Sequence, residues 1–490
     1  MIAHHATRQL CLLVLILMAS CDGGARTSGA DTLDAAGREL PGDDATPLIG
    51  DAATPDVPDA VSPTDTPDMA PDTTPDLPGD LGPTEIAADS SEDLSPDVPD
   101  PWPIPVLDEE PAPTCQAAID DPWYYQFLDN LCDEKVWPSD TDRDLACPIA
   151  DAGPGVTLAD GTLVTYVPSS APVEWDPAAL DGLLPPGMRM AVILVRRVDG
   201  VPHYRYLSGG DPDLPQQPWS TTKFLAIANA ASRLRIASSY DVGLTADAGG
   251  YRLGDLVTSV HAYDDDPFSS NGLGRWFHDI GGRERANALI HELWLGRPAV
   301  ETFGGNYGAA SPPIPYAFSE AGGASLVIDP DLSSGPANNL SLATLVEALK
   351  RLVLHREEAD QRLPGIQWAD LRVLFFGAEG STKYGPWGGM SADTAIYLQA
   401  GHDMDYIEAR SQGRWRIFSK LGLGTQGQFI HVGYACWPAL DATGAPIEGL
   451  GREFVIAAHL ASGGANLDER DRILARAYRR VILRIVDGRL

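Results

Sequence analysis

Two of the five lysines in this chain stand where an amine could take part in acid–base chemistry. Lys223 follows Ser220 by three residues, and Lys420 begins the segment Lys420-Leu421-Gly422. A desolvated lysine can lose its proton near neutral pH and arginine cannot, so a lysine kept among thirty arginines is a candidate for titration. Residues three apart share one face of a helix, so the Lys223 amine can reach the Ser220 hydroxyl. This spacing predicts an activated serine nucleophile.

The elements that would hold this pair begin with a hairpin. Residues 188–195 form an apolar run that predicts a buried strand, Asp199-Gly200 is typical of a tight turn, and residues 203–207 are the expected returning strand. Ser220 then opens a helix that continues from Lys223 to about residue 235, and the apolar residues of this helix predict burial.

The rest of the domain, which we place at residues 175–490, indicates a single sheet. The pattern is helical and loop-rich from residue 251 to about 357, and strand signals return after it. We therefore expect an α/β (α+β) fold with one five-stranded antiparallel sheet, flanked by helices and completed by both ends of the domain, plus an all-helical lobe. The expected segments are helices at 176–180, 283–295, 341–355 and 467–486, and strands at 415–418, 429–434 and 454–458.

The N-terminus carries an export signal. Arg8 precedes an apolar run at residues 10–18, which is too short to span a bilayer as a mature helix. The run ends in Leu17-Met18-Ala19-Ser20-Cys21 and resembles a bacterial lipoprotein signal. The resemblance implies cleavage before Cys21, lipidation of its thiol and a chain tethered on the periplasmic side of the cell envelope. An ordinary secretory peptide is the alternative, and the choice between inner and outer membrane stays open.

Most of the net charge of −34 lies in one linker. Residues 22–110 contain 23 acidic and 2 basic residues among repeated Thr, Pro and Asp, with almost no aromatic side chains. Such a segment cannot bury enough apolar surface to offset the cost of ordering its backbone, so we expect a disordered, extended spacer. No part of the chain is basic enough to indicate nucleic-acid binding.

Four cysteines remain after the signal segment. Cys115, Cys132, Cys147 and Cys436 would meet an oxidising compartment, where two disulfides are expected, and the sequence leaves all three pairings open. Three of the four lie in a proline-punctuated lead-in at residues 111–174. We expect no metal, because no histidine accompanies the cysteines at ligand spacing, and no cofactor.

Three motifs occur in one order: Ser220-x-x-Lys223, Ser269-Ser270-Asn271 and Lys420-Leu421-Gly422. They resemble the three motifs of the penicillin-recognising serine enzymes, the class A β-lactamases and penicillin-binding proteins. Flanking segments at residues 253–257, 279–282 and 467–471 are similar to the class A pattern as well. The resemblance covers about residues 175 to 488, and it implies a β-lactamase/transpeptidase-like fold.

The resemblance also implies a role for each motif residue. Ser220 would attack a carbonyl, with its own amide and that of Leu423 holding the oxyanion. Lys223 would take the proton from Ser220, and Ser269 would relay a proton to the leaving nitrogen. Asn271 would hold the amide of the substrate. The strand of Lys420 and Gly422 would also bind the substrate, and Lys420 would attract its carboxylate.

Two departures from the family pattern bear on activity. Leu421 stands where the family usually has Thr or Ser, so one hydroxyl bond to the substrate carboxylate is missing. The class A enzymes also use a glutamate as the base for deacylation, and here Glu301 lies five residues before Asn306, where the family spacing is four. Glu320 is a poorer candidate. Without such a base the acyl-enzyme would persist.

The sequence thus supports three hypotheses. The first is a serine hydrolase that opens β-lactams through a Ser220 acyl-enzyme, and the second is a penicillin-binding D,D-carboxypeptidase or transpeptidase that acts on peptidoglycan peptides. The third is a catalytically silent relative that binds partners in the envelope. For the enzymes we expect a monomer whose partners are a small β-lactam or D-Ala-D-Ala-type substrate and, through the lipid anchor alone, a membrane.

Overall fold

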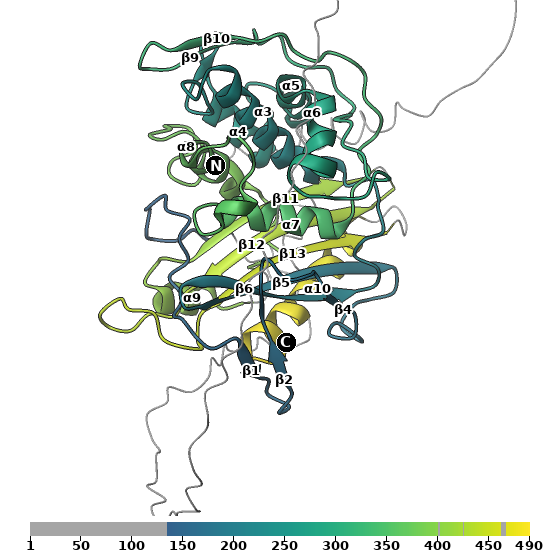
Figure 1. Ribbon diagram of the computed structural model, residues 1–490, viewed down its shortest axis with the longest axis vertical. Coiled ribbons are helices and arrows are strands. Elements are labelled where there is room, and N and C mark those ends of the chain that lie inside the picture. Colours follow the sequence, from purple (N-terminus) through teal and green to yellow (C-terminus); the bar gives the residue numbers. More distant parts are fainter. Residues whose placement is uncertain (1–134, 400–401, 425, 462–466) are drawn as a thin grey trace, which may run out of the picture. The chain divides into compact units, whose positions relative to one another are not determined.

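A seven-stranded sheet forms the centre of the described structure (Figure 1). The computed structural model describes residues 135–490 apart from 400–401, 425 and 462–466, so the predictions for Cys21, Cys115, Cys132 and the acidic linker lie outside the described residues. Five long strands run antiparallel in the order β11–β12–β13–β5–β6, and two short strands, β3 and β4, pair with β6. The bounds are β3 Val167–Pro168, β4 Trp175–Asp176, β5 Met188–Val198, β6 Val201–Gly209, β11 Arg416–Leu423, β12 Phe429–Trp437 and β13 Arg452–Leu460. The predicted antiparallel sheet, completed by both ends of the domain, is confirmed.

Strand β5 shows why this sheet is buried on both faces. Successive side chains of a strand point to opposite faces, and here both sets are apolar. Ile193 joins one apolar layer, and its neighbour Val192 joins the layer on the other side of the sheet. At the end of β5, Asp199 and Gly200 have φ angles of 53° and 75°, as a two-residue hairpin turn requires. The predicted turn to β6 is therefore confirmed.

Helices cover the two faces of the sheet (Figure 1). Helices α3, α7 and α8 share one apolar layer with Ile193 and Val455, and α10 shares the other layer with Val192 and Ile456. No helix in the part of the chain that the structure describes is both long and apolar enough to cross a membrane. The bounds are α3 Lys223–Ala237, α4 Leu253–Ala262, α5 Ser270–Gly281, α6 Arg283–Ala288, α7 Leu342–Val353, α8 Trp368–Phe376, α9 Met404–Ser411 and α10 Leu467–Val486.

Short elements complete the domain. Two small sheets, β1–β2 and β10–β9–β7–β8, lie apart from the central sheet. Their strands are β1 Gly155–Thr157, β2 Leu163–Thr165, β7 Asp247–Ala248, β8 Tyr251–Arg252, β9 Ala317–Ser319 and β10 Ser325–Val327. The short helical turns are η3 Trp219–Thr222, η4 Leu289–Leu293, η5 Ala359–Gln361 and η6 Gly389–Ala392.

Two predicted helices differ from the structure. The short helix at 176–180 is wrong: Asp176 belongs to strand β4, and isolated turns follow, such as the bond from Leu183 N to Leu180 O. Pairing with β6 and the burial of Leu180 and Leu183 outweigh the local helix signal. The helix expected at 283–295 ends as α6 at Ala288, and the chain continues in the π-helical turn η4.

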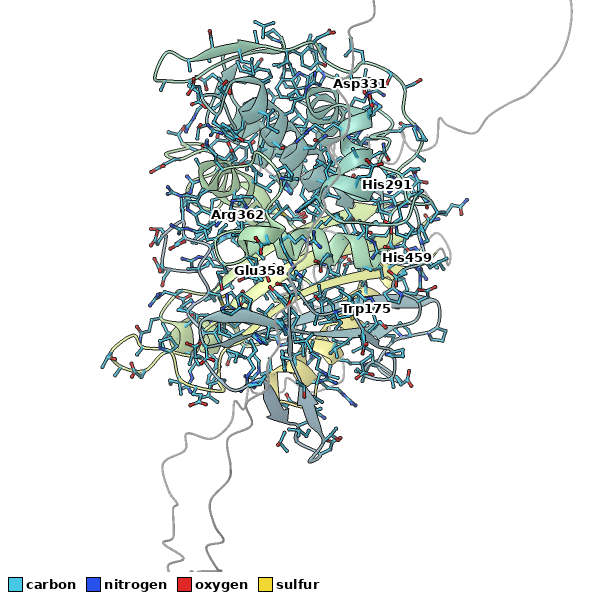
Figure 2. The ribbon with its side chains drawn as sticks, viewed as in Figure 1. Trp175, His291, Asp331, Glu358, Arg362 and His459 are labelled. Atoms are coloured by element: carbon cyan, nitrogen blue, oxygen red, sulfur yellow. A yellow bond between two sulfur atoms is a disulfide. The ribbon has the colours of Figure 1, made fainter. Side chains whose placement is uncertain are left out.

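Part of the cysteine-bearing lead-in belongs to this structure. A disulfide joins Cys147 to Cys436 of β12, which selects one of the pairings that the sequence left open. Arg416 of β11 donates to Asp142 O at 2.7 Å. Trp175 of β4, labelled in Figure 2, is the first residue of the predicted domain, and its ring lies edge-on against Tyr206 of β6 with centroids 5.4 Å apart. The residues before the predicted domain start therefore brace the sheet that carries the third motif.

Candidate active site

Ser220 lies in the turn η3, which runs directly into the buried helix α3. Trp219, the residue before it, has a left-handed backbone with φ of 51°. A bulky residue adopts this conformation only where the surroundings enforce it, and such positions concentrate at functional sites. The Lys223 amide donates to Ser220 O, so Ser220 and Lys223 are one helical turn apart, as predicted.

Strand β11 makes a close contact with this turn at Gly422. A Cβ atom at Gly422 would lie 2.5 Å from Pro218 O and from Thr221 Oγ1, so only glycine permits this approach. Thr221 Oγ1 also donates to Ile430 O of β12 at 3.0 Å. The sheet therefore meets the helical lobe at Ser220. Leu423, the last residue of β11, is close to this contact in sequence, and its role as an oxyanion donor stays a prediction.

Lys223 is fully buried, and the second motif holds its amine. Its Nζ donates to Ser270 Oγ at 3.0 Å and to Asn271 Oδ1 at 2.7 Å. Both partners are neutral. Burial and, secondly, the positive charge of Lys420 hold the pKa of Lys223 well below 10.5, while Asp265 acts in the opposite direction. Both effects favour the neutral amine, which is the form that can accept a proton.

Ser270, and not Ser269, contacts Lys223. The sequence motif predicts Ser269 as the proton relay. Ser269 is the N-cap of α5, and its exposed side chain accepts from Gly272 N at 3.1 Å. Ser270 begins the helix, is 1 % exposed, and donates to Val260 O at 2.7 Å. Among the described residues, no hydrogen bond joins Ser269 to Lys223, although Ser269 adjoins the site. The predicted relay role of Ser269 therefore has no supporting contact.

Lys420 is also fully buried, at the sheet side of the site. Its Nζ donates to Leu421 O at 3.1 Å and lies 3.8 Å from the carboxylate of Asp393. Burial lowers the pKa of Lys420 to about 8, although Asp393 acts in the opposite direction. Asp393 is fixed in place because it accepts from Leu421 N at 2.9 Å and from Ala395 N at 2.9 Å.

Tyr263 is a site residue that the sequence analysis missed. It follows helix α4 with a left-handed backbone, φ 53°. Its hydroxyl donates to Leu421 O at 2.5 Å and accepts from Lys420 Nζ. Its ring centroid lies 3.7 Å from Lys420 Nζ and 5.9 Å from Lys223 Nζ. Tyr263 thus stands between the two lysines, and burial followed by the charge of Asp393 raises its pKa well above 10, which keeps the phenol protonated.

Glu301 has a structural position that does not fit the predicted role of deacylation base. It is fully buried, and its carboxylate accepts from Ser341 N at 3.2 Å, Ser341 Oγ at 3.0 Å, Thr344 Oγ1 at 2.5 Å and Arg297 Nε at 3.2 Å. Four donors occupy the lone pairs of a carboxylate. Glu301 therefore fastens the start of α7, and no hydrogen bond joins it to Ser220 or Lys223 in the described structure.

Glu320, the second candidate for this base, also serves the scaffold. It lies in the hairpin between β9 and β10 and accepts from Gly243 N at 3.1 Å and from Thr245 Oγ1 at 2.8 Å. Neither candidate glutamate is therefore placed beside the serine–lysine pair.

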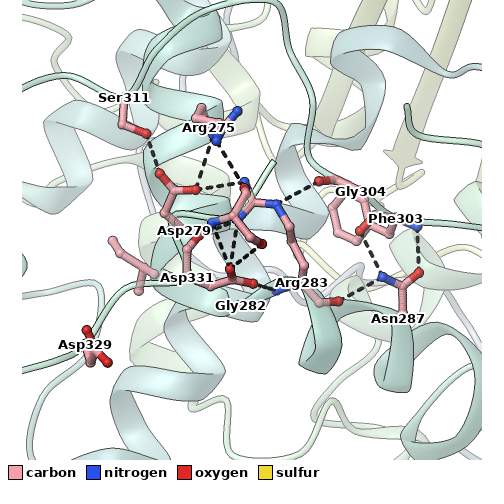
Figure 3. Close-up of polar contacts among 12 residues, drawn as sticks. Arg275, Asp279, Gly282, Arg283, Asn287, Phe303, Gly304, Ser311, Asp329 and Asp331 are labelled. Atoms are coloured by element: carbon pink, nitrogen blue, oxygen red, sulfur yellow. Dashed lines mark hydrogen bonds and ion pairs between the residues drawn. The ribbon is translucent and has the colours of Figure 1, made fainter. Parts of the chain in front are cut away.

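The long loop after α6 is fastened by an arginine cluster (Figure 3). Arg283 Nε donates to Gly304 O at 3.1 Å, and its Nη2 donates to Asp279 at 2.9 Å. Its amide donates to Asp331 Oδ2 at 2.8 Å, and its Nη1 to Asp331 O. One guanidinium therefore ties both ends of this loop to α5.

The loop in turn supports the turn that carries Ser220. Tyr307 Oη lies 3.1 Å from Thr222 Oγ1, and Asn338 Nδ2 donates to the same oxygen at 3.2 Å. The Tyr307 ring centroid is 5.5 Å from Lys223 Nζ. An aromatic ring and an amide therefore border the lysine on this side.

A cavity of about 520 Å³ lies between α5 and the same loop. Its lining includes Arg275, Asp279, Asn306 and Leu332, and it includes neither lysine of the site nor Ser220. The cavity therefore belongs to the junction of helix and loop.

The structure thus brings together most of the predicted groups. Lys223 and Asn271 are in direct contact, Gly422 adjoins the Ser220 turn, and Lys420 acts on Lys223 by its charge. Among the residues that were missed, the run Asp264-Asp265-Asp266 marks a turn beside Tyr263, but nothing in the sequence shows where that tyrosine points. Asp393 has no motif that could have found it.

Comparison with known proteins finds similar solved structures. No family model and no curated protein matches the chain. The chain is similar to solved class A β-lactamases. The class A β-lactamase of the last common ancestor of Gram-negative bacteria (GNCA4) has 15% identity and a TM-score of 0.36, over 61% of this chain and 94% of that one. The class A β-lactamase from Mycobacterium abscessus has 16% identity and a TM-score of 0.34, over 61% and 94% of the two chains.

Proposed function

We propose that this protein is a serine hydrolase that forms an acyl-enzyme at Ser220 and opens the amide of β-lactam rings. The observation that carries the proposal is the environment of Lys223. A buried amine with two neutral hydrogen-bond partners and a cation nearby is a base, and it lies one helical turn from a serine.

The chemistry follows from these positions. Ser220 Oγ attacks the carbonyl carbon as its proton passes to Lys223 Nζ, and the oxyanion forms beside the Ser220 amide. The carbon–nitrogen bond then breaks, and the leaving nitrogen takes up the proton that Lys223 holds. Lys223, neutral again, can take a proton from the water that hydrolyses the ester. A general base of this kind contributes about 10²- to 10⁴-fold to the rate.

A second candidate is a penicillin-binding D,D-carboxypeptidase or transpeptidase. The four hydrogen bonds to Glu301 favour it, because they take this carboxylate away from any attacking water. The two candidates share acylation at Ser220 and differ in how long the ester survives.

Intact-mass spectrometry over time with benzylpenicillin tests both candidates. We expect the wild-type protein to gain the mass of one penicillin, and Ser220→Ala to gain none. Ser170→Ala, at an exposed serine in the turn after β3, is the matched control and should label like the wild type. Loss of the label within minutes indicates a β-lactamase, and a label that persists for hours indicates a penicillin-binding enzyme. Absence of any label on Ser220 with both penicillin and an uncharged active ester contradicts the proposal.

We also propose that the chain is a lipoprotein on the periplasmic side of a bacterial envelope, anchored at Cys21. The signal at residues 10–21 supports this. In a Triton X-114 phase separation, the wild-type protein should enter the detergent phase and Cys21→Ala the aqueous phase. Equal partitioning of the two would contradict the anchor.

A further inference from the structure

Two of the three N–H donors of the Lys420 ammonium are already used within the protein. They donate to Tyr263 Oη and to Leu421 O at 3.1 Å. The carboxylate of Asp393 lies 3.8 Å from the same nitrogen as an ion-pair partner. Lys420 is also fully buried. A substrate carboxylate can therefore reach this cation only after a present partner leaves.

The charges around Lys420 do not favour an anion either. Asp393 offsets the charge of Lys420 at close range. The turn after Tyr263 carries Asp264, Asp265 and Asp266, and Lys383 pairs with the first and third of these at 3.1 Å and 2.9 Å. Asp265 is close enough to Lys223 to act on its pKa. A substrate carboxylate that approaches Lys420 from this side therefore meets other carboxylates, and like charges repel.

Leu421 removes the other means of binding a carboxylate on this strand. Its side chain is 3% exposed and packs in the apolar layer on the side of α10. Its carbonyl is the acceptor for both Tyr263 and Lys420. The strand therefore presents an acceptor that is already occupied, where an anion would need donors.

We infer that Tyr263 determines substrate specificity by closing the anion subsite at Lys420, so that, among the esters and amides that acylate Ser220, uncharged ones react faster than β-lactams that carry a carboxylate. The inference rests on the acylation of Ser220 proposed above. Of the three partners of Lys420, Leu421 belongs to the central sheet and Asp393 is fully buried, whereas Tyr263 is partly exposed. The Tyr263 side chain is therefore the one that an anion would have to displace. Lys420 then keeps an electrostatic role: its charge lowers the pKa of Lys223.

Steady-state kinetics with two chromogenic substrates test this inference. The uncharged substrate is p-nitrophenyl butyrate, and the carboxylate-bearing one is nitrocefin. We expect wild-type kcat/KM to be higher for the ester. Tyr263→Gly suits the left-handed backbone and removes the whole side chain, and it should raise kcat/KM for nitrocefin about tenfold or more, mainly through a lower KM. The readout is the ratio of the two kcat/KM values, nitrocefin over ester, which should rise by about the same factor.

Two further variants complete the design. Tyr263→Phe removes only the hydroxyl, and it should give a smaller gain with nitrocefin in the same direction. Tyr240→Gly is the matched control, because Tyr240 is an exposed tyrosine with a φ of 77° outside the site, and it should leave both substrates unaffected. If the wild type labels Ser220 with the ester but no Tyr263 variant changes the ratio of the two substrates, the inference is wrong and the proposed function stands. If neither substrate labels Ser220, both are wrong.

Discussion

Lys223 and Lys350 are both buried lysines on helices, but Lys350 has an anionic partner and Lys223 has neutral ones. Lys350 of α7 lies 2.9 Å from the carboxylate of Glu347 and 4.2 Å from the ring centroid of Tyr204. Lys223 of α3 has two neutral oxygen partners, and the nearby Lys420 is a second cation. A carboxylate favours the charged amine, and a cation favours the neutral one. The two lysines are equally buried, and the difference between them lies in their partners.

Substitution of each lysine should give the largest difference between Lys223 and Lys350. Lys223→Met should lower the rate of Ser220 acylation by about 10³-fold, because a general base is lost. Lys350→Met should leave that rate within about twofold and instead lower the melting temperature, because Glu347 loses one of its cationic partners. Stopped-flow acylation with an uncharged ester and thermal unfolding measure the two effects. Comparable loss of acylation in both variants would contradict the comparison.

Glu301 extends the comparison to a carboxylate whose partners fix it in a structural role. Glu301→Gln should lower the free energy of unfolding by about 3 kcal/mol, because Arg297 and two hydroxyls lose an ionised acceptor. The rate at which the acyl-enzyme hydrolyses should not change in the folded protein. Urea unfolding and the decay of the penicillin adduct check the two outcomes. A tenfold slower decay at unchanged stability would restore Glu301 as the deacylation base.

A single substitution should make the environment of Lys223 resemble that of Lys350. Asn271→Asp places a carboxylate 2.7 Å from the lysine amine and favours its charged form. Acylation at pH 7 should fall, and the acidic limb of its pH profile should move to higher pH by about 1–3 pH units. Recovery of the rate at higher pH distinguishes this effect from a general loss of structure. A lower rate with an unmoved limb would contradict the role given to the neutral partner.

The titration of Lys420 should have the smallest effect, and it should appear in the pH profile of acylation of the wild type. Its pKa is lowered to about 8, so its charge is present below pH 8 and is lost as pH rises through that value. Acylation should therefore fall by up to about tenfold above pH 8, because the cation that helps to lower the pKa of Lys223 disappears. Between pH 8 and the ordinary lysine pKa, the unfolded chain binds a proton at Lys420 that the folded protein has lost, so the free energy of unfolding rises with pH. The expected loss of acylation is therefore not caused by unfolding. A profile that is flat from pH 7 to 10 would contradict this assignment.

Much of the fold was predictable because its strong signals are local. The apolar runs of β5, β12 and β13 and the Asp199-Gly200 turn each specify an element from neighbouring residues alone. The helix at 176–180 was predicted from equally local signals and is wrong, because Asp176 pairs with Leu207 of β6, thirty-one residues further along the chain. Long-range pairing of this kind has no mark in the segment itself.

The site shows the same division between local and long-range information. Motif spacing placed Lys223, Asn271 and Lys420 together correctly. It could not decide between Ser269 and Ser270, because a shift of one residue at the start of α5 turns a side chain from solvent to the lysine. Two of the residues that donate to Glu301, Ser341 and Thr344, lie forty or more residues away at the start of α7, so the sequence around Glu301 gave no sign of these bonds.

The bond between Cys147 and Cys436 spans 289 positions of the chain, and every residue of the candidate site lies inside that covalent ring. A protease that cuts one exposed connection within the ring leaves two fragments that remain joined. Nicked protein would therefore migrate as a single species on a denaturing gel until a reductant separates the pieces.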